Sequence, residues 1–198
     1  MAWGERLDAA FLLASELHRE QTRKTRSIPY LSHLMSVAAL VAEAGGTEDE
    51  VIAALLHDAA EDQGGQAILD RIREEFGDAV ADVVEGCSDS LADTTAPGSR
   101  QEKAPWRERK ETYIAHLAGA SSSVLLVSCA DKLHNARCLV IGLREVGPDL
   151  WDRFNGGRRT LWYYQELLIA FRAGEAPSLL LDDLARVVLV LEELAAED

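Results

Sequence analysis

The chain has 198 residues and a formal charge of −14, from 20 basic and 34 acidic side chains. With 47% hydrophobic and 27% charged residues, it has the composition of a folded globular protein, which excludes wholesale disorder. A chain of this length can bury one sufficient core, and the acidic excess argues against a nucleic-acid binder because phosphate backbones would be repelled.

Helical periodicity dominates from the N-terminus onward. Three segments repeat apolar residues at three- and four-residue spacing: DAAFLLASEL (8–17), HLMSVAALVAEA (33–44) and DEVIAALLHDAAED (49–62). Acidic residues interrupt the first of them, and no run of about 18 apolar residues occurs, so neither a secretory signal nor a membrane span is expected. Thr47 and Glu50 form a potential capping box before the third segment.

The rest of the chain continues the helical pattern. Further helices are predicted at 67–76, 78–87, 105–118, 121–146, 158–174 and 178–195. The stretch 88–105 is rich in Ser, Thr, Pro, Gly and Asp, which indicates a long surface loop and a candidate lid. Three cysteines without a C-x-x-C pair favour a reducing compartment. We therefore expect an all-α, single-domain helical bundle over residues 1–198, cytoplasmic, with a homo-oligomer left open.

The charge is unevenly distributed. Residues 48–93 contain fourteen acidic side chains and only two arginines. Two basic segments flank them, 19–26 and 100–110, each with a net charge of +3. Most of these charges are expected to solvate outer helix faces.

The segment HDAAED at 57–62 does not fit that explanation. His57 and Glu61 are one helical turn apart, as are Asp58 and Asp62, and they continue an apolar face. Buried carboxylates need partners because an uncompensated buried charge is costly. A divalent cation is a suitable partner, since imidazole and carboxylate together suit manganese, iron or zinc.

Two further residues have the character of ligands. His33 opens the apolar helix at 33–44, and Asp131 lies in a long apolar run with Asn135 one turn later. Taken singly, His33 can be explained as a hydrogen-bonded core histidine and Asp131 as a partner of Lys132 or Arg137. Taken together, a histidine, a His-Asp pair and an aspartate in apolar helices favour a metal site. For His134, a role supporting the ligands and a purely structural role are equally open.

The order H…HD…D is similar to that of the HD metal-dependent phosphohydrolase superfamily, whose fold is all-α. More narrowly, Arg26-x-x-Pro29-Tyr30-x-x-His33, HDAAED at 57–62 and ADKLHN at 130–135 resemble the hydrolase domain of RelA/SpoT-type proteins, specifically the small hydrolase-only members. The motif core spans residues 19–145, and C-terminal helices at 148–198 follow it.

The resemblance implies both a cofactor and a reaction. The cofactor would be Mn²⁺, or another divalent transition metal, held by His33, His57, Asp58 and Asp131. The reaction would remove the 3′-pyrophosphate of (p)ppGpp and give GDP or GTP and pyrophosphate. The expected partner is therefore a small nucleotide, with no nucleic acid and no membrane. Glu61 and Asp62 resemble the catalytic acidic pair of the family, and which of them acts as base or acid is left open.

The expected substrate-binding residues include basic and hydrogen-bonding side chains. Lys24 and Arg26 fall where the family places basic residues that meet guanine and phosphates. Arg107 and Lys110 are close enough in a helix to act as a phosphate clamp, although solvent exposure is the commoner fate of such residues. The complete expected set is Lys24, Arg26, Tyr30, Asn135, Arg107 and Lys110.

Two alternatives remain beside the alarmone hydrolase. The family commonly has an adjacent Arg-Lys pair followed by a small residue, whereas Thr25 separates Lys24 from Arg26. This departure favours an HD-fold phosphohydrolase that acts on another nucleotide or on a phosphate monoester. The second alternative, a non-catalytic nucleotide-sensing module, is disfavoured because Glu61 and Asp62 are both present.

Overall fold

The computed structural model describes residues 3–89, 91 and 104–196. Within these ranges all regular structure is helical, apart from an isolated antiparallel bridge between Thr22 and Pro29. The helices are α1 (Glu5–Leu17), α2 (Leu31–Glu43), α3 (Glu48–Leu56), α4 (Ala59–Gln63), α5 (Gln66–Phe76), α6 (Asp78–Cys87), α7 (Trp106–Leu117), α8 (Ser122–Val146), η1 (Pro148–Arg153), η2 (Gly157–Arg159), α9 (Thr160–Ala173) and α10 (Ser178–Ala196). The all-α prediction is confirmed.

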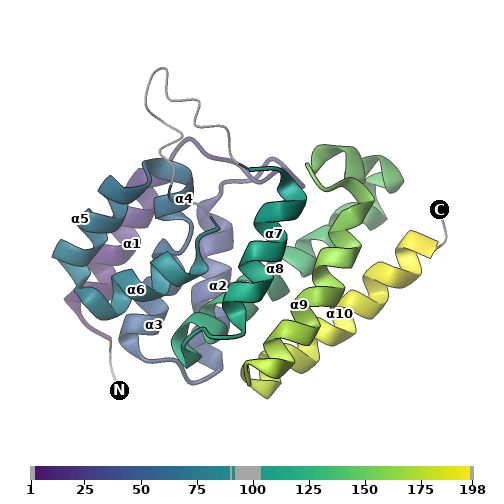
Figure 1. Ribbon diagram of the computed structural model, residues 1–198. Helices are drawn as coiled ribbons and strands as arrows, with labels where there is room; N and C mark the ends of the chain where they lie inside the picture. The colour runs from purple at the N-terminus through teal and green to yellow at the C-terminus, as the bar shows by residue number, and fades with distance from the viewer. Residues whose placement is uncertain (1–2, 90, 92–103, 197–198) are drawn as a thin grey trace.

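Helix α8 forms the centre of the arrangement. It packs against α2, α3, α6 and α10, and its buried residues extend from Val124 to Leu143. Figure 1 shows α1, α3, α5 and α6 on one side of α2 and α8, with α9 and α10 on the other side. A residue in the middle of α8 can therefore meet side chains from α2 and from the end of α3.

The start of α3 follows its sequence signal. The Thr47 hydroxyl accepts a bond from the Glu50 N–H at 3.4 Å, and the Glu50 carboxylate accepts one from the Thr47 N–H at 2.7 Å. This capping box satisfies two amide groups that the first turn of a helix leaves without partners.

The end of α3 departs from the prediction of one continuous helix over 49–62. Helix α3 ends at Leu56 and α4 begins at Ala59, so His57 and Asp58 lie in the turn between them. The His57 ring donates through Nδ1 to the Ala54 carbonyl at 2.8 Å, the acceptor that a continuous α-helix reserves for the Asp58 N–H. The turn brings the side chains of His57 and Asp58 together, with 3.0 Å between His57 Nε2 and Asp58 Oδ2.

The remaining boundaries lie within a few residues of those predicted for α5 to α10. Two short 3₁₀ helices, η1 and η2, were not predicted, and they connect α8 to α9. Most of the expected lid at 88–105 lies outside the described residues. No helix among the described residues is both long and apolar enough to span a bilayer. A single domain over 1–198, with its motif core at 19–145, stays a prediction.

Candidate active site

Four predicted ligands converge at the centre of the molecule. His33 comes from the first turn of α2, His57 and Asp58 from the turn after α3, and Asp131 from the middle of α8. The His33 Nε2 atom lies 3.1 Å from Asp131 Oδ1, and His57 Nε2 lies 3.0 Å from Asp58 Oδ2. The two crossed nitrogen–oxygen distances are both 3.5 Å. Such spacings are those of neighbouring ligands around an ion bound at roughly 2.0–2.2 Å.

The histidine rings test whether a metal fits this cluster. Both rings are buried, and among the described residues neither Nε2 atom has a hydrogen-bond partner. The other ring nitrogens are held, because His57 Nδ1 donates to the Ala54 carbonyl and His33 Nδ1 lies 2.7 Å from His134 Nδ1. A neutral histidine that donates through Nδ1 presents the lone pair of Nε2, as a metal ligand requires. The donor set therefore fits a divalent metal.

His134 supports His33 from the side away from the cluster. Burial, and after it the neighbouring His33, lower the pKa of His134 to about 4, so its ring is neutral near pH 7. A neutral ring has one donor and one acceptor nitrogen, so it can accept a hydrogen bond from the His33 Nδ1–H. This contact fixes the orientation of the His33 ring.

Both aspartates of the cluster are ionised. Burial alone would raise the pKa of Asp58 and Asp131, but nearby positive charge outweighs it and holds both pKa values well below the usual range. The opposing charge beside Asp131 comes from Lys132, and beside Asp58 it comes from a proton on His57, which a metal ion bound at His57 Nε2 would replace. The Tyr30 hydroxyl also donates to Asp58 Oδ2 at 2.6 Å. Two carboxylates in this state neutralise the charge of a divalent ion.

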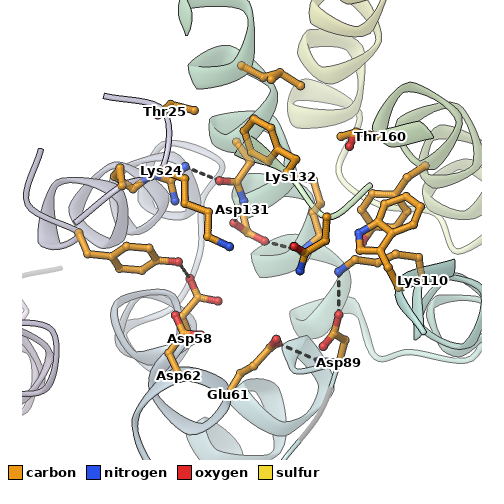
Figure 2. Close-up of a pocket in the computed structure, with 18 of the residues that line it drawn as sticks. Lys24, Thr25, Asp58, Glu61, Asp62, Asp89, Lys110, Asp131, Lys132 and Thr160 are labelled. Carbon is orange, nitrogen blue, oxygen red and sulfur yellow. Dashed lines mark hydrogen bonds and ion pairs between the residues drawn. The ribbon is translucent and has the colours of Figure 1, made fainter. Parts of the chain in front are cut away.

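The predicted acidic pair lies next to this cluster on α4. Glu61 and Asp62 line a cavity of about 370 Å³ together with Asp58 and Asp131. Figure 2 shows Asp58, Glu61 and Asp62 on one side of this cavity and Lys110 on the other. Glu61 Oε2 accepts a bond from the Asp89 N–H at 3.2 Å, and Asp62 Oδ2 accepts one from the Gln21 amide at 2.8 Å. The acidic pair thus faces the same space as the ligand cluster.

Four of the six expected substrate-binding residues line this cavity: Lys24, Tyr30, Asn135 and Lys110. Arg26 does not line it, because its guanidinium pairs with Glu145 at 2.9 Å near the end of α8. Arg107 does not line it either, because it pairs with Glu111 at 2.6 Å and lies 3.2 Å from the centre of the Trp162 ring.

Two neighbouring arginines, Arg23 and Arg109, line the cavity instead. Arg23 donates to the Asn135 side-chain oxygen at 2.5 Å and lies over the Tyr30 ring at 5.3 Å. Because Arg23 and Lys24 are adjacent and a small residue follows them, the departure from the family pattern noted for Lys24 and Arg26 disappears. The adjacent pair Arg23-Lys24 was thus visible in the sequence, but the sequence interpretation used Lys24 and Arg26 instead.

Asp89 is a cavity residue that the sequence interpretation missed. Arg109 Nη1 lies 2.7 Å from both of its carboxylate oxygens, and Lys110 Nζ lies 2.7 Å from one of them. Burial raises the pKa of this carboxyl, but the charges of Lys110 and Arg109 outweigh that effect and hold the pKa well below its usual range. Nothing in the local pattern distinguishes Asp89 from the surface acids around it.

Part of the cavity lining is aromatic. Trp106, Tyr163 and Tyr164 line it, and the buried Tyr163 hydroxyl has no hydrogen-bond partner among the described residues. Trp106 packs directly on Gly156, where an added Cβ would lie 2.5 Å from the Trp106 ring. Both tyrosines are buried, so they combine a core position with a place in the cavity lining.

Comparison with known proteins gives consistent matches. Residues 10–162 match a family described as HD domain. The chain is 33% identical over 166 residues to the guanosine-3′,5′-bis(diphosphate) 3′-pyrophosphohydrolase MESH1 of Xenopus tropicalis, and the match covers 80% of this chain and 81% of that protein. It is 32% identical over 169 residues to the bifunctional (p)ppGpp synthase/hydrolase SpoT of Escherichia coli, where it covers 82% of this chain and only 21% of SpoT.

A solved structure agrees with the fold. It is described as a metazoan ortholog of SpoT that hydrolyses ppGpp and plays a role in starvation responses. The two structures superpose with a TM-score of 0.72 at 24% sequence identity, and the match covers 94% of this chain and 96% of the other. At this identity the likeness shows a shared fold.

Proposed function

This chain belongs to the HD domain family, and we propose that it is a metal-dependent hydrolase that removes the 3′-pyrophosphate from guanosine alarmones, (p)ppGpp. The observation that carries the proposal is that an acidic pair and several cations line one cavity together with Asp58 and Asp131, two members of the four-residue ligand cluster. The printed functions of MESH1 and SpoT support the choice of substrate. Such an activity would lower alarmone levels in the stringent response.

The proposed cofactor is Mn²⁺, with His33, His57, Asp58 and Asp131 as its protein ligands. A mixed set of two imidazoles and two carboxylates suits this ion. When bound, the metal would supply Lewis-acid polarisation of a phosphate oxygen and would lower the pKa of a water molecule.

The acidic pair provides the proton transfers in this proposal. Hydrolysis joins a water oxygen to the phosphorus attached to ribose O3′ and breaks the bond from that phosphorus to O3′. The water loses a proton and O3′ gains one, so that the products are a nucleotide with a free 3′-hydroxyl and pyrophosphate. Glu61 and Asp62 lie at the cavity edge beside the ligands, where one can accept the first proton and the other can supply the second.

The cations of the cavity hold the phosphates. Lys110 and Arg109 approach from α7, and Lys24 approaches from the loop before α2. Charge-assisted hydrogen bonds from these groups are stronger than neutral ones, and they balance the negative charge on the oxygens of the transferred pyrophosphate. The aromatic residues of the cavity lining offer flat surfaces of the kind on which a nucleoside can pack.

The decisive experiment measures products from a set of nucleotides. Purified protein with Mn²⁺ is incubated with ppGpp, pppGpp and common nucleotides, and pyrophosphate and nucleotide products are separated by ion-exchange chromatography. We expect pyrophosphate with GDP from ppGpp and with GTP from pppGpp, and no activity for the Asp58→Ala variant. Circular dichroism would show that this variant remains folded.

Two results would contradict the proposal. Turnover of another nucleotide or a phosphate monoester, with ppGpp left intact, would make the chain an HD-fold phosphohydrolase with a different substrate. Tight binding of ppGpp without turnover under Mn²⁺, Mg²⁺ and Zn²⁺ would make it a nucleotide sensor.

A further inference from the structure

A buried chain of hydrogen bonds leads from the end of α1 to Asp62. His18, which follows the last residue of α1, is only 2% exposed, and its Nδ1 atom lies 2.5 Å from Gln21 Oε1. The Gln21 side-chain amide donates to Asp62 Oδ2 at 2.8 Å. Gln63, at the end of α4, donates its amide to the same Gln21 oxygen at 2.9 Å. His18 itself does not line the cavity.

The directions of these bonds follow from the chemistry of the groups. The Gln21 amide donates to Asp62 through its nitrogen, so its oxygen, which only accepts, faces His18. His18 must then carry its proton on Nδ1. Burial lowers the pKa of His18, so the neutral ring with a protonated Nδ1 is the expected state. Its Nε2 atom is buried without a partner among the described residues.

The ring of His18 is held in place by Tyr30. The two rings are stacked, with centroids 5.2 Å apart and planes inclined by 15°. This stacking restrains the rotation of the imidazole, so that Nδ1 stays directed at the Gln21 oxygen. Tyr30 is in turn fixed by its bond to Asp58.

This chain of hydrogen bonds contacts the short helix α4, which carries Asp62. The helix has only five residues, Ala59–Gln63, and two glycines with positive φ, Gly64 and Gly65, follow it. A helix of about one turn has little stability of its own, so its orientation depends on outside contacts. The bonds from Gln21 reach both Asp62 and Gln63 at the end of α4.

We propose that His18 is a positioning residue, which fixes the Gln21 amide so that Gln21 holds the Asp62 carboxylate in its reactive orientation. The inference rests on the proposed function in one respect, that Asp62 takes part in proton transfer. His18 acts through Gln21 and touches neither substrate nor metal ligands of the cavity. We therefore expect a substitution that breaks the bond to Gln21 to lower kcat by a larger factor than it changes KM.

The matched variants are His18→Asn and His18→Gln. The asparagine amide nitrogen takes the place of Nδ1 and can still donate to Gln21, whereas the glutamine nitrogen takes the place of Nε2 and points away. Both are neutral amides with a similar cost of burial. We expect His18→Asn to keep most of the wild-type kcat and His18→Gln to lose roughly tenfold to a hundredfold, the range seen when outer partners of site residues are removed. Equal losses in the two variants would overturn the proposal.

A double-variant comparison separates positioning from a general structural effect. In an Asp62→Ala background Gln21 has no carboxylate to hold in place. His18→Gln should therefore change the residual kcat by less than about twofold. A purely structural role predicts the same factor in both backgrounds, and that result would count against the inference.

An NMR measurement tests the link without any activity. Long-range ¹H–¹⁵N spectra of the imidazole rings should show His18 protonated at Nδ1 and unprotonated at Nε2 in the metal-free protein, and Gln21→Leu should disturb this state. A ring protonated at Nε2 would overturn the proposal. If the wild-type protein hydrolyses a substrate other than ppGpp, the proposed function fails while the kinetic test proceeds with that substrate, and in a protein without activity the NMR result decides.

Discussion

The acidic and the basic groups at the cavity differ in whether they have partners within the protein. On the ligand side, two buried histidine nitrogens face ionised carboxylates and lack hydrogen-bond partners among the described residues. On the basic side, Arg109 and Lys110 already share the carboxylate of Asp89. The ligand side thus fits an added cation, whereas on the basic side one carboxylate of the protein already offsets part of the charge of two cations. A phosphate that binds there must compete with a resident anion.

The largest expected effect comes from the ligand side. Asp131→Asn keeps the shape of the side chain but removes a negative charge, so Mn²⁺ binding should weaken and hydrolysis should fall by roughly a thousandfold or more, since a metal supplies several kcal/mol of transition-state stabilisation. The measurements are kcat/KM and the increase in Tm on addition of Mn²⁺. Asp82→Asn, at an exposed position on α6, serves as the control. An undiminished Mn²⁺-dependent Tm increase in Asp131→Asn would remove Asp131 from the ligand set.

The next effect separates chemistry from metal binding. Glu61→Gln should lower kcat by about 10² to 10⁴-fold, because an amide neither accepts nor supplies the required proton. The Tm increase caused by Mn²⁺ should equal that of the wild-type protein, since Glu61 is not among the proposed ligands. Loss of that increase would instead place Glu61 among the metal ligands, and the proposed separation of metal ligands from the acidic pair would be wrong.

A smaller effect tests the resident anion. Asp89→Asn leaves Arg109 and Lys110 without their carboxylate, so they should bind substrate phosphates more readily and KM should fall a few-fold. The same change should reduce the free energy of unfolding by about 1–3 kcal/mol, because buried cations lose a charged partner. Initial rates and urea denaturation measure the two quantities. Glu111→Gln is the matched control, since Glu111 pairs with Arg107 outside the cavity. An increase in KM would mean that Asp89 positions the cations for substrate.

The stability difference between wild type and Asp89→Asn should depend on pH in a defined direction. Burial opposes ionisation of Asp89, but Lys110 and Arg109 outweigh it, so the folded-state pKa lies below the unfolded value of about 3.9. The stabilisation is therefore fully present above that unfolded value and is lost as the pH falls toward the folded pKa. Urea denaturation from pH 7 to pH 3 should show a constant difference that shrinks only below about pH 4.

The smallest effect compares two nearby cations. Lys24→Ala should raise KM by roughly tenfold, in line with loss of one hydrogen bond to a charged group. Arg26→Ala should leave KM unchanged and alter stability by less than about 1 kcal/mol, because its exposed pair with Glu145 contributes little. Substrate titrations of both variants provide the test, and a rise in KM for Arg26→Ala would bring that residue back into the substrate site.

The ligands were predictable because each is a polar side chain inside an apolar helical pattern. His33, His57, Asp58 and Asp131 stand out as a set rather than singly, the resemblance to the HD superfamily implies that they are ligands, and the structure brings their atoms together. Asp89 and Arg109 did not stand out, because their significance depends on a contact between residues 20 positions apart that local periodicity does not encode. The break between α3 and α4 was missed for a different reason, since it is accompanied by a local side-chain bond from His57 to the Ala54 carbonyl that the spacing of apolar residues does not show.

The choice between Arg23 and Arg26 required the three-dimensional path of one loop. Thr22 pairs with Pro29 across this loop, and Ser27 adopts a positive φ within it. Arg23 meets Asn135 on α8, whereas Arg26 meets Glu145 on the same helix. Ten residues of helix separate these two partners by about 15 Å. The two arginines are close in sequence, but their partners on α8 are far apart, and only Arg23 lines the cavity.

The contact between Gly156 and Trp106 has a practical consequence for engineering. A methyl group at position 156 would meet the indole at 2.5 Å, so Gly156→Ala obliges Trp106 to shift against the cavity wall. Position 156 is not among the residues that line the cavity, and it acts on the aromatic part of the lining through Trp106, which does line it. A small library at this position is therefore the most direct way to change which molecules the cavity accepts while the reacting groups stay untouched.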